Sequence, residues 1–190
     1  MSFWEMARPF ELMSAMGRKM PPVANGRNGW IADIALRTYQ ALIAAMSEQS
    51  FHIAPRDKPG LLAAMMREFA GDACISFEGD LHRIDWTGIS AIEEVETSLR
   101  RQTSDPILDF VILPLTPETR PLIWEAVSKV DHLADDGIIH TQIEKDGRLA
   151  FGAYDNFHPD CVWAGHAVPR SLLQGLKESG VIRSFDAAEA

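Results

Sequence analysis

The chain has 190 residues, with 18 Lys/Arg against 27 Asp/Glu and a formal net charge of −9. An acidic chain repels nucleic-acid phosphates, which argues against DNA or RNA as a partner. Its two cysteines are too few for a disulfide framework, and its most apolar long run is interrupted by charged and polar residues. We therefore expect a soluble, cytoplasmic protein without a membrane span.

The first 29 residues contain five methionines and a turn-rich stretch. We interpret residues 1–29 as a Met-rich N-terminal segment and connector. Residues 30–190 have the length of one folded unit, and we expect a single α+β domain there. A homodimer that docks through residues 1–29 is a further hypothesis.

Two helices are predicted next. Apolar residues recur at helical spacing over 31–47, which predicts the first. Asp57 is the expected N-cap of the second, over 58–70. Five apolar residues of this helix share the face that we expect to be buried: Leu61, Leu62, Met65, Met66 and Phe69.

A β-hairpin is predicted over residues 73–86. Hydrophobic residues alternate on both sides of Gly79-Asp80, which suits a two-residue turn. That register pairs Phe77 with His82. It therefore places the His82 imidazole on the apolar face of the hairpin.

A helix and a strand are expected between residues 89 and 115. The spacing over 89–102 predicts a helix with four inward residues, Ile89, Ile92, Val95 and Leu99, and three glutamates on its solvated side, Glu93, Glu94 and Glu96. The run 107–115 is almost continuously apolar, which is typical of a central strand buried on both faces. Asp109 interrupts this run and would need a partner if it were buried.

A further helix and a second hairpin follow. The helix is expected over 119–134, with an inward stripe that includes Leu122, Ile123, Ala126 and Val127. The hairpin is expected over 138–153. We predict a three-residue loop with Gly147 in the left-handed conformation, because that loop sets Ile143 against Leu149 and keeps one face apolar.

A short strand at 161–164, a helix over 169–179 and a last strand over 181–185 complete the predicted elements. Together they predict an α+β fold. We expect an antiparallel or mixed sheet built from two hairpins plus a central strand, with helices packed mainly on one face.

Reactive side chains are concentrated in residues 154–161. Tyr154, Asp155, His158 and Cys161 are the candidate catalytic residues, and His140 lies upstream in the second hairpin. Cys161 would act as a thiol nucleophile, activated by His158 or His166, with Asp155 or Asp160 orienting the imidazole. The alternative interpretation is a loop in which His and Asp cap backbone groups around a buried cysteine.

A metal site is a second hypothesis for the same stretch. His158, Cys161 and His166 form a His-x2-Cys-x4-His series and are the candidate ligands. Imidazole and thiolate suit Zn²⁺, which takes three or four such ligands in a tetrahedron. The spacing matches no established zinc finger, and no phosphate-binding loop or dinucleotide motif occurs. We therefore expect no cofactor.

These observations favour a non-catalytic protein that binds another protein, with a basic surface as the expected partner. Small bacterial inhibitors and immunity proteins share this acidic character, by composition only. The alternative is a small hydrolase or ligand-binding enzyme with a site around His140, Tyr154, Asp155, His158 and Cys161. The sequence favours the non-catalytic interpretation because it contains no known catalytic motif.

Overall fold

The computed structural model describes residues 50–128 and 137–188. They belong to a compact unit that begins at Ser47. The predicted segment 1–29, the predicted helix 31–47 and the last residues of the predicted helix 119–134 lie outside the described residues. Within the described part of the chain, no helix is both long enough and apolar enough to cross a bilayer.

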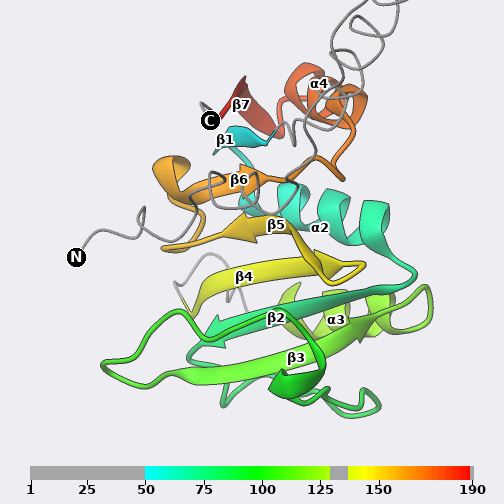
Figure 1. Ribbon diagram of the computed structural model, residues 1–190, viewed down its shortest axis with the longest axis vertical. Coiled ribbons are helices and arrows are strands. Elements are labelled where there is room, and N and C mark those ends of the chain that lie inside the picture. Colours follow the sequence, from blue (N-terminus) through cyan, green and yellow to red (C-terminus); the bar gives the residue numbers. More distant parts are fainter. Residues whose placement is uncertain (1–49, 129–136, 189–190) are drawn as a thin grey trace, which may run out of the picture. The chain divides into compact units, whose positions relative to one another are not determined.

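The described residues form an α+β fold, as predicted (Figure 1). In chain order, the strands and α-helices are β1 (Phe51–Pro55), α2 (Lys58–Phe69), β2 (Ala73–Gly79), β3 (Asp109–Leu115), α3 (Thr119–Ser128), β4 (Ile138–Lys145), β5 (Arg148–Ala153), β6 (Val162–Ala164), α4 (Arg170–Glu178) and β7 (Ile182–Ala187). Two 3₁₀ turns are η2 (Glu94–Glu96) and η3 (Pro159–Cys161). The strands make one antiparallel sheet in the order β3-β2-β4-β5-β6-β1-β7.

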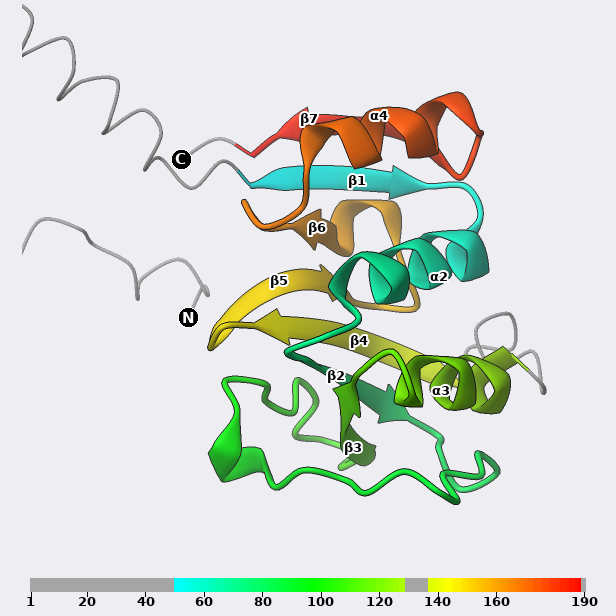
Figure 2. The same ribbon diagram turned by 90° about the vertical axis from the view of Figure 1, so that its right-hand side faces the viewer.

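The two faces of this sheet are covered differently. Alternate strand residues such as Ile75, Leu113, Ile143 and Phe151 are fully buried in one hydrophobic core, which the helices share. Figure 2 shows α2 and α3 against this face. The long irregular connection between β2 and β3 begins on the same side, where Leu81 and Ile84 join the core, and then passes to the other side. Because side chains alternate along a strand, the opposite face presents the intervening polar residues.

The locally encoded helices match their predictions. The Asp57 side chain caps α2 by accepting the N–H of Gly60 at 3.0 Å, and all five residues predicted for its buried face are buried. Helix α4 spans Arg170–Glu178, close to the predicted 169–179. On α3, the prediction that Leu122 faces inward was wrong. Its side chain is 42% exposed, because the buried face of the helix is formed by Ile123, Ala126 and Val127.

The first predicted hairpin was wrong. Strand β2 pairs along its whole length with β3 on one side and β4 on the other, so residues 81–86 cannot pair with it. His82 is exposed and does not lie on the apolar face. Strand β3 stands at the edge of the sheet and not at its centre. Its outer side is partly covered, because the Ile92 N–H donates to the Ile112 carbonyl at 2.8 Å.

The predicted helix over 89–102 was also wrong. The segment is irregular apart from η2, and Val95, expected to face inward, is 84% exposed. A helix would use the backbone N–H groups of this segment internally. Here the N–H groups of Ser98, Gln102 and Thr103 instead donate to carboxylates of the sheet.

The second hairpin forms, but its turn differs from the prediction. Lys145 pairs with Arg148, so the loop has two residues, Asp146 and Gly147, with φ of 53° and 72°. A bulge then shifts the register, and Ile143 pairs with Phe151. The bulge places the apolar residues of both strands on one face. The prediction had assigned this effect to a three-residue loop.

Candidate functional site

The sheet face opposite the helices carries a row of buried polar side chains. Glu78 on β2 is 1% exposed, and Gln142 and Glu144 on β4 are 3% and 8% exposed. Glu78 pairs with His140 across the two strands, so that imidazole lies on the same face. Buried carboxylates are unfavourable unless hydrogen bonds replace the lost water.

Those hydrogen bonds come from a segment that we call the strap, residues 97–103. The N–H groups of Gln102 and Thr103 donate to the two Glu78 carboxylate oxygens at 2.7 and 2.8 Å. The Ser98 N–H donates to the Glu144 carboxylate. The Gln142 side-chain amide donates to the Arg100 carbonyl at 3.2 Å. The strap therefore contributes backbone groups to all four hydrogen bonds. These bonds do not depend on which side chains the strap carries.

An exposed acidic turn, residues 93–96, directly precedes the strap in the chain. Glu93, Glu94 and Glu96 are all exposed, as is Val95. Within the described residues, none of the three carboxylates forms an ion pair with a basic side chain. The nearby Arg100 guanidinium donates instead to backbone carbonyls, including that of Thr97 at 2.6 Å. The three carboxylates of the turn are therefore not neutralised by ion pairs within the described residues.

His140 links the strap to a second loop. Its Nδ1 atom accepts the N–H of Asp155 at 3.2 Å, so in the neutral ring the proton lies on Nε2. The Nε2–H then donates to the Thr103 hydroxyl at 3.1 Å. Burial lowers the pKa of His140, and the charges of Glu78 and Asp155 oppose that shift. Both ring nitrogens therefore serve contacts within the protein.

Acid is expected to weaken the fold through His140. The folded-state pKa is depressed, so the unfolded chain takes up the proton first as pH falls below the ordinary value of 6.5. Stability from this group is complete above that pH and declines on acidification until the folded-state pKa is passed. Urea unfolding at stepped pH values measures the decline. A His140→Gln variant should show a smaller decline, and an equal decline in both proteins would contradict this role.

The second loop contains a left-handed turn, residues 155–157. Asp155, Asn156 and Phe157 have φ of 49°, 50° and 59°, a conformation that costs about 1–2 kcal/mol per non-glycine residue. Burial of the Phe157 ring, 1% exposed, offsets this cost. So does the 2.8 Å hydrogen bond from the Asn156 N–H to the Ile139 carbonyl. The turn borders a hollow of about 380 Å³ whose lining includes Lys58, Asn156 and His158.

The predicted catalytic residues lie around this loop, where contacts occupy one His158 nitrogen and the surroundings disfavour ionisation of Cys161 and Tyr154. His158 Nδ1 accepts the Asp160 N–H at 3.3 Å and caps η3. Burial raises the pKa of the Cys161 thiol, and the charges of Asp155 and Asp160 raise it further. Burial also raises the pKa of Tyr154, whose ring lies 5.7 Å from that of His140. The structure brings His140, Tyr154 and Asp155 together.

The three predicted zinc ligands are not brought together. His158 lines the hollow beside Lys58, whereas His166 lines a different hollow, of about 640 Å³, with Trp163 and Arg148. Cys161, the last residue of η3, is half-buried and lines neither hollow. Among the described residues, donor atoms that could share one ion come instead from Asp80, His82 and Asp109.

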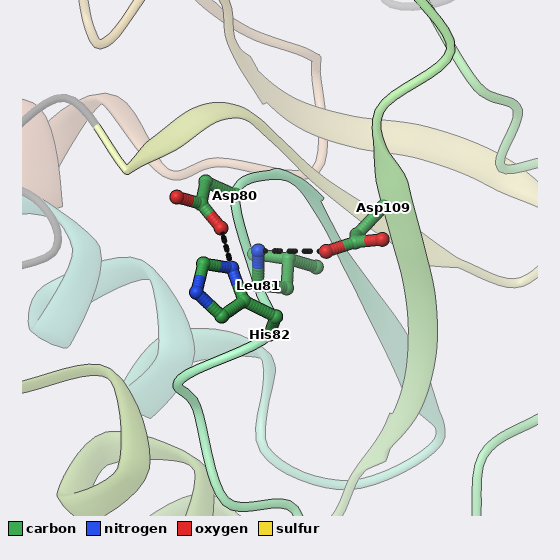
Figure 3. Close-up of polar contacts among 4 residues, drawn as sticks. All are labelled: Asp80, Leu81, His82 and Asp109. Atoms are coloured by element: carbon green, nitrogen blue, oxygen red, sulfur yellow. Dashed lines mark hydrogen bonds and ion pairs between the residues drawn. The ribbon is translucent and has the colours of Figure 1, made fainter.

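Figure 3 shows this Asp80–His82–Asp109 group. One ligand atom from each residue lies within 4.8 Å of the others, and all three side chains are exposed. His82 Nδ1 contacts the Asp80 carboxylate, and Asp109 accepts the Leu81 N–H at 3.1 Å. One imidazole and two carboxylates can bind a divalent ion if water completes its coordination. The Asp-x-His spacing could have indicated Asp80 and His82, but not Asp109, and it began in the predicted hairpin turn.

Two arrangements therefore invite a functional interpretation: the acidic turn held by the strap, and the left-handed turn beside His140. Both depend on contacts between residues far apart in the chain. No protein-family model, no curated protein and no solved structure matches this chain.

Proposed function

We propose that the protein is a cytoplasmic, non-catalytic binding protein that docks a basic partner protein through the acidic turn. One observation carries the proposal. Val95 is 84% exposed in the middle of three exposed glutamates, on a segment whose other end is fixed to the sheet by buried carboxylates. An apolar side chain held out in water by an anchored backbone gains free energy when a partner covers it.

The anchoring of the strap supports rapid and specific docking. A segment that is already ordered loses little conformational entropy on binding, so more of the contact energy contributes to affinity. Three exposed carboxylates outnumber the one guanidinium beside them, that of Arg100, so the turn attracts a basic surface and raises the association rate at low salt. The partner surface should therefore combine Lys or Arg side chains with a small apolar socket for Val95.

The enzyme hypothesis is the weaker of the two. It places nucleophilic or acid–base chemistry on Cys161, His158, Asp155, Tyr154 and His140. A thiol with a raised pKa is mostly protonated at neutral pH, and an imidazole that uses both nitrogens internally is a poor base. These contacts favour a structural role for the loop.

The test compares Val95→Ser with Leu122→Ser in the full chain. Both residues are exposed hydrophobics, but Leu122 lies on α3 and not on the acidic turn. Each variant is used as bait at low salt in a lysate of the source cells, and bound proteins are identified by mass spectrometry. We expect wild type and Leu122→Ser to retain the same basic protein, and Val95→Ser to retain at least about tenfold less, with unchanged thermal stability.

Two outcomes would contradict the proposal. One is equal retention by Val95→Ser and Leu122→Ser. The other is the absence of any protein above background with wild type in replicate experiments. A triple Glu→Gln variant at positions 93, 94 and 96 provides a second readout, because it should slow association and flatten its dependence on salt.

A further inference from the structure

A small hollow opens between α2 and α3, in the helix layer of the domain. It has a volume of about 320 Å³, within the range of small-molecule sites. Its lining consists of Ala63, Met66 and Arg67 from α2 and Arg120, Pro121 and Trp124 from α3. The hollow thus combines two positive charges with an apolar, partly aromatic surface on a strongly acidic protein.

Arg67 is exposed and Arg120 is half-buried, and the contacts of Arg120 differ from those of the other half-buried arginine in the described residues. Among the described residues, Arg101 and Arg120 are the half-buried arginines. Arg101 donates to the Leu108 carbonyl and lies over the Phe110 ring at 5.2 Å. Arg120 has no such acceptor, carboxylate or ring among the described residues, and neither has Arg67. A partly desolvated cation without a partner is unfavourable, so an anion bound here would be stabilising.

The position of Arg120 on its helix adds to this cost. Arg120 is the second residue of α3, and the first turn of this helix contains no acidic residue. A helix N-terminus carries partial positive charge, which disfavours a cation and favours an anion. Glu118 precedes the helix, but its fully exposed carboxylate bonds to Thr116, which lowers the pKa of Glu118. The positive end of α3 and the Arg120 charge therefore act in the same direction, and the ionised, fully exposed Glu118 carboxylate offsets them in part.

The apolar part of the lining determines what else the ligand carries. Of the apolar residues that line the hollow, Met66 is 1% exposed and Trp124 is half-buried. A flat ring can pack against an indole and a thioether at little entropic cost. We propose that the hollow binds a small organic anion, whose carboxylate or phosphate pairs with Arg120 and Arg67 and whose ring lies against Trp124 and Met66.

The test is an NMR titration of the ¹⁵N-labelled full chain with three probes: phenyl phosphate, benzoate and neutral benzamide. The Trp124 indole N–H resonance is assigned with Trp124→Phe. We expect either anion, or both, to shift this resonance and the Arg120 side-chain resonance, with benzamide much weaker. Arg120→Gln should weaken anion binding at least about tenfold, since one charge-assisted hydrogen bond contributes that much. Higher ionic strength should weaken it as well.

Arg183→Gln is the matched control, because Arg183 is an exposed arginine on β7 that does not line the hollow. It should leave anion binding unchanged. The proposal is overturned if neither anion shifts the Trp124 resonance, if benzamide binds as well as the tighter-binding anion, or if Arg120→Gln and Arg183→Gln have equal effects. Each variant's amide spectrum reports whether it is folded, so a misfolded variant is recognised and replaced by Arg67→Gln.

Discussion

Replacing Glu78 with alanine is expected to lower the free energy of unfolding by about 3 kcal/mol. The substitution removes the acceptor of two charge-assisted hydrogen bonds, from the N–H groups of Gln102 and Thr103. It also leaves a space at a position where the side chain is 1% exposed. We expect the strap to separate from β2 while the helix-side core stays folded. Urea denaturation followed by far-UV circular dichroism measures the loss.

Glu93→Ala is the control for this experiment. Glu93 belongs to the same connection but is exposed, so its removal should change stability by no more than about 0.5 kcal/mol. A loss of stability in Glu78→Ala no larger than in Glu93→Ala would show that the buried carboxylate does not anchor the strap.

Gly79→Ala is expected to destabilise the protein by about 4 kcal/mol, among the largest effects of a single methyl group. Gly79 has φ of 153°, and a Cβ atom there would lie 2.0 Å from the carbonyl oxygen of Gly137. The same oxygen accepts the Asp80 N–H at 2.8 Å. The clash is with backbone, so it can be relieved only by moving the end of β2 away from β4.

Gly71→Ala separates the two causes of this loss of stability, which are the unfavourable φ angle and the clash of the Cβ atom with Gly137. Gly71 has nearly the same φ, 157°, but a Cβ atom there would meet nothing within 4 Å. It should therefore show only the conformational cost, about 1 kcal/mol. Thermal and urea unfolding of the two variants give the comparison. Equal losses would mean that close packing against Gly137 is not what requires glycine at position 79.

Elements governed by neighbouring residues were predictable from the sequence. Helix α2 depends on the Asp57 cap and an apolar stripe, both of which lie within the helix or next to it. The β4–β5 hairpin is likewise local, although its bulge was missed because a bulge changes the register without changing the pattern of hydrophobic residues. Strand β1 was not predicted, because its five residues pair only with β6 and β7, far along the chain.

The strap could not be predicted for the same reason. Its anchors join residues 24 to 46 positions apart in the chain, and helical periodicity over 89–102 suggested a different structure. Nothing in the sequence around Glu78 indicates that its carboxylate is buried beneath another segment. The polar alternation of β2 and β4 is the signal that could have indicated a covered polar face.

The function of the reactive groups in residues 154–161 was equally hard to predict from the sequence. Sequence reasoning can show that an imidazole and a thiol are close along the chain, but not whether backbone groups already use them. His158 caps η3 and His140 bridges two loops, contacts that depend on the local fold of the turn. The catalytic role of these residues stays a prediction. The alternative interpretation, that they cap backbone groups, describes the contacts of His158.

Amide hydrogen exchange tests the anchoring of the strap most directly. In wild-type protein, the N–H groups of Ser98, Gln102 and Thr103 should exchange about a thousandfold more slowly than in an unstructured peptide, because buried carboxylates accept them. Exchange of all three at the unstructured rate would contradict the account. The acidic turn would then be a loose loop, without the fixed backbone on which the proposed docking depends.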